Sequence, residues 1–128
     1  MASIQSHRDL IVWQKAMDLS VEVYSLAKKL PPSENFRMVA QLTGAAVSVP
    51  ANIAEGRARS TRKDYGNFLA IAQGSLAETE TYVLLAVRLG YLTEADTNAV
   101  TLLIGEVGRM LTALRQKLNP RLIVVSNP

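Results

Sequence analysis

Helix-breaking residues divide this chain into four stretches of similar length. The breaks lie at Leu30-Pro31-Pro32-Ser33, around Gly56 to Thr61 and at Gly90-Tyr91-Leu92-Thr93, and Asn119-Pro120 ends the last stretch. Proline and glycine at such positions stop helices. Between the breaks, apolar residues recur every three or four positions, which is the spacing of one stripe along a helix. The sequence therefore predicts four helices, with no strand-like alternation before residue 121.

The lengths of the four stretches predict how they are arranged. Helices of about 23–29 residues joined by short loops have to run antiparallel to their neighbours. The expected fold is all-α, an antiparallel up-down-up-down four-helix bundle. It divides the 128 residues into an N-terminal extension (1–7), the bundle (8–118) and a C-terminal tail (119–128). The tail contains Leu122-Ile123-Val124-Val125, and docking on the bundle, a short strand and disorder all remain open for it.

The second and third helices carry more apolar surface than one core requires. Each stretch has a core stripe, with Val23, Ile53, Leu69 and Leu111 among its members, but these two also have a second apolar or small face. A helix that is apolar on two faces is buried on two sides. We therefore expect self-association, and the residues assigned to the subunit interface are Gly44, Val47, Ser48, Ala51, Ala54, Ile71 and Tyr82. Pro50 lies inside the second helix and removes one backbone hydrogen bond.

The charges are unevenly distributed once this topology is assumed. The net charge is only +3. However, the start of the first helix, the turn after the second and the end of the fourth meet at one end, which we call the basic pole. Lysines and arginines outnumber carboxylates there, and a cluster of this kind binds phosphate. The residues expected to bind nucleic acid are Arg57, Arg59, Arg62, Lys63, Arg115 and Lys117; the alternative interpretation is a solvated turn.

The residue types that most enzymes use are scarce. The chain has no Cys and a single His, His7, which excludes thiolate chemistry and the Glu-x-x-His pairs of di-iron bundles. Asn52, Glu55, Ser75 and Glu78 are interpreted as a hydrogen-bond network that fixes helix register. The alternative for the two glutamates is acid–base work or Mg²⁺ binding. We expect no catalytic residue, no metal, no cofactor and no enzymatic activity.

Nothing in the sequence indicates a membrane or an export route. The N-terminus lacks the apolar region of a signal peptide. No stretch reaches the roughly 18–20 apolar residues of a membrane span. We expect a cytoplasmic protein without a membrane partner.

Four motifs resemble one protein family in order and spacing. They are Asp9-Leu-Ile-Val-Trp13-Gln-Lys-Ala16, Ala45-Ala-Val-Ser-Val-Pro-Ala-Asn-Ile-Ala-Glu-Gly56, Gly74-Ser-Leu-Ala-Glu78-Thr-Glu80 and Leu89-Gly-Tyr-Leu92. Over roughly residues 8–118 the chain resembles the four-helix bundle proteins encoded in intervening sequences of bacterial 23S ribosomal RNA genes. It is similar, more distantly, to the accessory variability determinant of diversity-generating retroelements.

The resemblance implies a homopentamer of four-helix bundles around a central channel, with no established catalytic activity. It also implies nucleic-acid binding by a basic surface, and the retroelement relative binds a reverse transcriptase as well. Two functions follow as hypotheses. The first is a non-enzymatic homo-oligomer that binds RNA or DNA through the basic pole. The second is a protein–protein interaction scaffold or accessory subunit without direct nucleic-acid contact.

Overall fold

The structure, a computed structural model, describes residues 5–119. These residues form helices and no strand, which confirms the all-α prediction. The four long helices are α1 (Ile11–Ala27), α2 (Ala40–Arg57), α3 (Arg62–Arg88) and α4 (Glu94–Leu118). Short helical turns lie before α1, at η1 (His7–Asp9), and before α2, at η2 (Pro32–Glu34) and η3 (Asn35–Val39). Arg121 and the apolar run of the tail lie outside the described residues.

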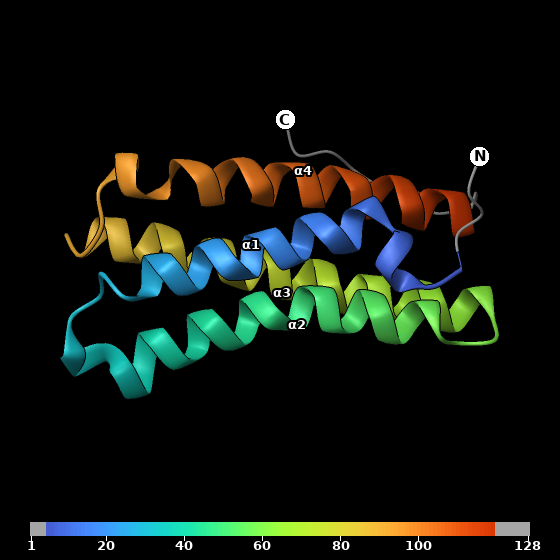
Figure 1. Cartoon of the computed structure of the whole chain (residues 1–128), viewed down its shortest axis with the longest axis horizontal. Coiled ribbons are helices and arrows are strands. Elements are labelled where there is room, and N and C mark those ends of the chain that lie inside the picture. Colours follow the sequence, from blue (N-terminus) through green and yellow to red (C-terminus); the bar gives the residue numbers. More distant parts are fainter. Residues whose placement is uncertain (1–4, 120–128) are drawn as a thin grey trace.

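The four helices form a square bundle. Each long helix packs mainly against two others: α1 against α2 and α4, and α3 against α2 and α4. In Figure 1 the chain crosses the view from right to left in α1 and α3 and from left to right in α2 and α4. Ion pairs join Lys15 to Glu106 at 2.9 Å and Lys29 to Asp96 at 2.8 Å, so α1 and α4 meet in opposite sequence order. In such a square, the α1–α2 seam and the α3–α4 seam lie on opposite faces.

Local hydrogen bonds set where the helices begin. The Thr61 hydroxyl accepts from the Asp64 amide at 3.1 Å at the start of α3. Thr93 and Asp96 cap each other reciprocally at the start of α4, with distances of 3.1 and 2.9 Å. At both starts a Thr is followed three residues later by an acid, a sequence pattern that caps helices. The first helix begins later than its pattern indicates, because the segment from His7 to Asp9 forms a separate short turn.

The core lies where the apolar stripes meet. Its largest fully buried side chains include Leu19, Leu42, Ile53, Leu69 and Leu111. The apolar spacing also places the aromatic residues Trp13, Tyr65 and Phe68 on these stripes, but they are only half-buried at the edge of the core. The stripes therefore predicted much of the aliphatic core but not Leu19 or Ile104, which are also buried. The aromatic residues lie between the core and solvent.

A hydrogen bond between α1 and α2 compensates for Pro50. Because proline has no N–H, the carbonyl of Ala46 lacks its usual donor four residues later. The buried hydroxyl of Ser20 lies 3.2 Å from that carbonyl oxygen and 3.0 Å from the oxygen of Ala16 in its own helix. A buried carbonyl without a partner is costly. The serine thus allows a proline to lie in the middle of a buried helix.

A glycine near the end of α2 lets α3 approach closely. Gly56 is buried, and a Cβ added there would lie 2.8 Å from the Cβ of Phe68 and 3.1 Å from a ring carbon of Tyr65. Real Cβ atoms do not come this close to other atoms. Gly56 therefore sets the separation of α2 and α3 beside the turn that joins them.

Candidate nucleic-acid interface

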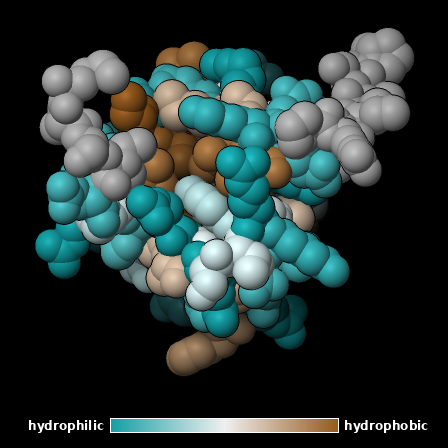
Figure 2. Space-filling view, turned by 90° about the vertical axis from the view of Figure 1, so that its right-hand side faces the viewer, coloured by the Kyte–Doolittle hydropathy of each residue, from teal (hydrophilic) through white to brown (hydrophobic). Residues whose placement is uncertain are grey.

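The ends of three helices form the basic pole. The end of α2, the start of α3 and the end of α4 all lie at the right of Figure 1. Figure 2 looks onto that end, where hydrophilic side chains project around a smaller hydrophobic area. The predicted nucleic-acid-binding residues Arg57, Arg59, Arg62, Lys63 and Arg115 therefore lie on one end of the molecule, and so does Lys117.

Three of these residues line one hollow. A pocket of about 390 Å³ lies between the start of α3 and the end of α4, and Arg62, Lys63 and Arg115 line it. Asn67 and Asn119 add amide groups to the same walls. Guanidinium and ammonium groups with amides around a small hollow are donors for the oxygens of a phosphate. Lys117 is exposed on α4 but does not line this pocket.

The two arginines at the end of α2 have different surroundings. Arg59 pairs with Glu55 at 2.9 Å and lies over the ring of Phe68, 4.6 Å from its centroid. Arg57 lies near Tyr65: burial raises the pKa of the Tyr65 phenol, and the Arg57 charge acts in the opposite direction. These contacts place both side chains on the α2–α3 side of the basic pole, away from the pocket between α3 and α4.

A second hollow beside this pocket is lined by residues that were not predicted as site residues. This hollow of about 620 Å³ continues along α3 and α4, lined by Gln73, Gly105, Arg109 and Thr112 among others. Arg115 donates from Nη1 to Oε1 of Gln73, and Gln73 donates from Nε2 to the Thr112 hydroxyl at 3.0 Å. No periodic pattern marks these residues. The sequence signal nearest to them is Gly105 inside the fourth helix, because glycine in a helix interior is unfavourable unless its lack of a side chain is used.

Within residues 5–119, the cations along α3 and α4 form no ion pair with a carboxylate. The ion pairs among residues 5–119 are Lys15–Glu106, Lys29–Asp96 and Arg59–Glu55. None involves Arg62, Lys63, Arg109, Arg115 or Lys117. Among the described residues, cations are therefore paired between α1 and α4 and unpaired between α3 and α4, where the carboxylate that lines the hollows is that of Glu80. Unpaired cations favour binding of an anion.

The predicted polar network is smaller than expected and has a different membership. The hydroxyl oxygens of Ser48 and Ser75 lie 2.8 Å apart, and Asn52 donates to the carbonyl and hydroxyl oxygens of Ser48 at 2.8 and 2.9 Å. Glu55 and Glu78 do not belong to it: Glu55 pairs with Arg59, and both glutamates are exposed. A carboxylate in water avoids the desolvation that burial beside the serines would cost.

The predicted interface residues fall on two different faces. Val47, Ala51 and Ala54 line a hollow of about 680 Å³ between α1 and α2, which we call the α1–α2 groove. Ser48 instead faces α3 through Ser75. Gly44, Ile71 and Tyr82 lie at helical spacing from these serines and share that α2–α3 face.

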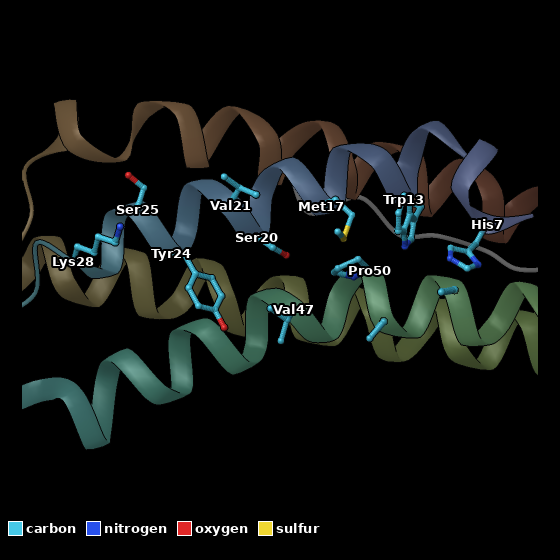
Figure 3. A pocket seen from close by; sticks show the side chains of 12 residues that line it. His7, Trp13, Met17, Ser20, Val21, Tyr24, Ser25, Lys28, Val47 and Pro50 are labelled. Atoms are coloured by element: carbon cyan, nitrogen blue, oxygen red, sulfur yellow. The ribbon is translucent and has the colours of Figure 1, made fainter.

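The α1–α2 groove is mostly apolar. On α1, Met17 is 41% exposed, Val21 67% and Tyr24 52%. Figure 3 shows Tyr24 extending from α1 towards α2 beside Val47. The exposed apolar side chains of α1 thus lie beside those of α2 on one face of the bundle.

Comparison with known proteins identifies the family. A family model described as 23S rRNA-intervening sequence protein matches residues 8–113. This chain belongs to the 23S rRNA-intervening sequence protein family. It is also similar to the crystal structure of a protein of unknown function from the S23 ribosomal protein family of Bacteroides thetaiotaomicron. The two are 27% identical with a TM-score of 0.77, over 83% of this chain and 99% of that one. No curated protein matches this chain significantly.

The family match covers only part of the basic pole. Gly56, Arg57, Arg62 and Lys63 lie inside the matched residues 8–113. Arg115 and Lys117 follow its end. The pocket between α3 and α4 therefore combines cations from within the match with one from beyond it.

Two kinds of site are absent from the described part of the chain. Between residues 5 and 119, no group of three or more His, Asp or Glu side chains is placed to hold a metal ion. Over the same residues, no helix has the length and apolar character needed to cross a membrane.

Proposed function

We propose that this member of the 23S rRNA-intervening sequence protein family is a non-catalytic, self-assembling helical bundle that binds nucleic acid through its basic pole. One observation carries the proposal. Arg62, Lys63 and Arg115 come from two helices, line one pocket and have no carboxylate partner among residues 5–119.

The physical basis is the release of counterions from phosphates. Each phosphate that a lysine or arginine neutralises frees condensed cations, so affinity falls steeply with salt. A single chain offers few such contacts. In an assembly of antiparallel bundles such as the pentamer that the family resemblance implies, subunits that point the same way bring several basic poles to one end.

Binding is tested by fluorescence anisotropy with labelled RNA and DNA at low and moderate salt. We expect binding tighter than millimolar at low salt, and loss of affinity in the Arg62→Ala/Lys63→Ala double variant. Removing two phosphate contacts should reduce the slope of log K against log salt by about 1.4 for a single strand. The matched control is Arg37→Ala/Arg88→Ala, which removes two exposed cations at the opposite pole. Millimolar or weaker binding at low salt, or equal behaviour of the two double variants, contradicts this function.

Self-assembly is supported by exposed apolar side chains on several helices. Besides the α1–α2 groove, they include Ile71 at 51%, Leu84 at 58% and Leu102 at 68% exposed. Light scattering at micromolar concentration should give a mass several times that of the chain. A species of 14.0 kDa contradicts self-assembly.

The α1–α2 groove also supports the second function, an interaction scaffold without nucleic-acid contact. In that case a purified partner should bind stoichiometrically after nuclease treatment. Val21→Glu should abolish the complex, and Arg62→Ala/Lys63→Ala should leave it intact. A complex lost on nuclease treatment argues against the scaffold and for the basic pole.

A further inference from the structure

Two neighbouring hollows lie between α3 and α4, and together we call them the α3–α4 groove. Arg115 lines the hollow at the basic pole, and Gln73 lines the next one along the bundle. The hydrogen bond between these two side chains lies where the hollows meet. The groove therefore runs from Arg62 and Lys63 at one end to Arg109 further along α4.

Gln73 orients the guanidinium of Arg115. Its Nε2 donates to the Thr112 hydroxyl at 3.0 Å, which directs its carbonyl oxygen Oε1 towards Arg115. One N–H of Arg115 is used in this contact. A guanidinium has five N–H donors in a fixed plane, so the remaining donors are available to a bound oxyanion. Gln73 is thus a positioning residue for Arg115.

Gly105 gives Arg109 its place in the groove. A Cβ added at Gly105 would lie 3.2 Å from Nη1 of Arg109, and the other atoms within 4 Å also belong to that guanidinium. Glycine in a helix interior destabilises the helix relative to alanine. Here it leaves space for a cation to lie against the helix, and no ion pair holds Arg109 among residues 5–119.

We propose that the α3–α4 groove binds the phosphate backbone of a single nucleic-acid strand, from Arg62, Lys63 and Arg115 at the basic pole to Arg109. This inference rests on the proposed nucleic-acid binding and assigns its path. Arg109 and Arg115 are separated along α4 by about 9 Å, six residues at 1.5 Å each. Hollows of about 390 and 620 Å³ have the size of small-molecule sites, so they suit a single backbone, not a duplex. Glu80 lines the far end, where its charge repels further phosphates.

The sharpest test is Gly105→Ala, which displaces Arg109 without removing a charge. The control is Gly74→Ala, at an exposed glycine inside α3 with nothing within 4 Å of the added Cβ. The probe is fluorescein-labelled oligouridylate of about 20 nucleotides, longer than the site of one single-strand-binding fold. The added Cβ shifts the Arg109 guanidinium and weakens its contact, so the salt slope should fall by up to about 0.7, the value of one lost contact, which is at most about fivefold weaker binding at about 0.1 M salt. Both variants should melt at or above the temperature of the unchanged protein, since alanine favours the helix.

A second variant tests the positioning of Arg115. Gln73→Glu places a carboxylate against the guanidinium and should lower both the affinity and the salt slope by the amount of one contact. Gln41→Glu adds the same charge at an exposed position of α2 and should change neither by as much. A merely structural role of Gln73 would lower the melting temperature and leave the salt slope unchanged.

The outcomes distinguish binding along the α3–α4 groove from nucleic-acid binding by the basic pole in general. No binding of any probe by the unchanged protein overturns both. If Arg62→Ala/Lys63→Ala weakens binding but Gly105→Ala binds as tightly as Gly74→Ala, the α3–α4 groove is ruled out as the path of the strand. The basic pole then remains the binding site. A duplex RNA bound more tightly than oligouridylate also overturns the path. Weaker oligouridylate binding by Gly105→Ala and Gln73→Glu, with both controls unchanged, supports it.

Discussion

The two seams on either side of α3 use glycine in opposite ways. At the α2–α3 seam, a Cβ on Gly56 would meet the Cβ of Phe68 at 2.8 Å and the backbone oxygen of Tyr65 at 3.2 Å. At the α3–α4 seam, a Cβ on Gly105 would meet only the guanidinium of Arg109. The first glycine brings two helices together, and the second leaves room for a charged side chain. The role of a glycine inside a helix therefore depends on which atom a side chain at that position would contact.

The same contrast extends to charge. The cations that contact other helices across the α1–α4 seam have carboxylate partners, Glu106 and Asp96. The cations of the α3–α4 groove have none among the described residues. Paired charges should affect folding, whereas unpaired ones should affect binding of an anion.

Gly56→Ala should have the largest effect on stability. The added methyl group forces α2 and α3 apart at Phe68, and overpacking of a close contact costs about 1–3 kcal/mol. We expect the upper part of that range, because the atom it meets at 2.8 Å is a Cβ fixed to the backbone of α3. Urea denaturation measures the change, with Gly74→Ala as the control. Equal stability of the two variants would show that the α2–α3 seam is not closed by Gly56.

Ser20→Ala should have the next largest effect, and it should depend on Pro50. The substitution leaves the Ala46 carbonyl without a donor, which costs about 1–3 kcal/mol for a buried group. In a Pro50→Ala background the backbone N–H of residue 50 can supply that donor, so the cost of Ser20→Ala should fall. A double-mutant cycle in urea gives the coupling. Additive effects of the two substitutions would contradict the compensation between Ser20 and Pro50.

Gly105→Ala should change stability in the opposite direction from Gly56→Ala. Only a flexible guanidinium has to move, and alanine is favoured over glycine in a helix interior by about 1 kcal/mol. The expected gain is measured by the same urea titration. A loss of stability would mean that α3 and α4 are packed more closely at Gly105 than the structure shows.

The smallest expected effect is a pH dependence of stability that arises from the Lys29–Asp96 ion pair at the α1–α4 seam. The Lys29 ammonium and the Thr93 backbone amide lower the pKa of Asp96 to about 2. The pKa of an unfolded Asp is about 3.9, so this carboxylate stabilises the fold above about pH 4. That contribution should be lost as the pH falls towards 2. Thermal melts of the unchanged protein and Asp96→Asn should therefore converge in acid; a constant difference between them contradicts the assignment.

Much of the fold could be predicted from the sequence because it depends on local signals. Apolar spacing gave the buried stripes, and Thr61 and Thr93 gave the starts of α3 and α4. The segment before α2 was not anticipated. There Glu34 accepts a hydrogen bond from the Met38 amide at 3.4 Å, and residues Asn35–Val39 form a wider π-helix turn. This contact carries no periodic signature.

The candidate site was predicted only in part, because its geometry depends on packing between helices. The topology placed Arg62, Lys63 and Arg115 at one end, where they now line one pocket. The topology did not show that Arg59 lies apart from these three residues. Its partner Glu55 was expected instead in the hydrogen-bond network with Asn52 and Ser75. Gln73, Thr112 and Arg109 were missed because nothing in a linear pattern shows that a glutamine orients an arginine 42 residues later.

Photocrosslinking tests most directly whether the α3–α4 groove, unlike the other seams, binds a nucleic-acid strand. Oligouridylate with scattered 4-thiouridine would be bound to the unchanged protein at low salt, irradiated and mapped by peptide mass spectrometry. The account predicts crosslinks on α3 near Arg62 to Gln73 and on α4 near Arg109 to Arg115. Crosslinks concentrated in the α1–α2 groove near Tyr24 and Val47, or spread evenly over the surface, would contradict it.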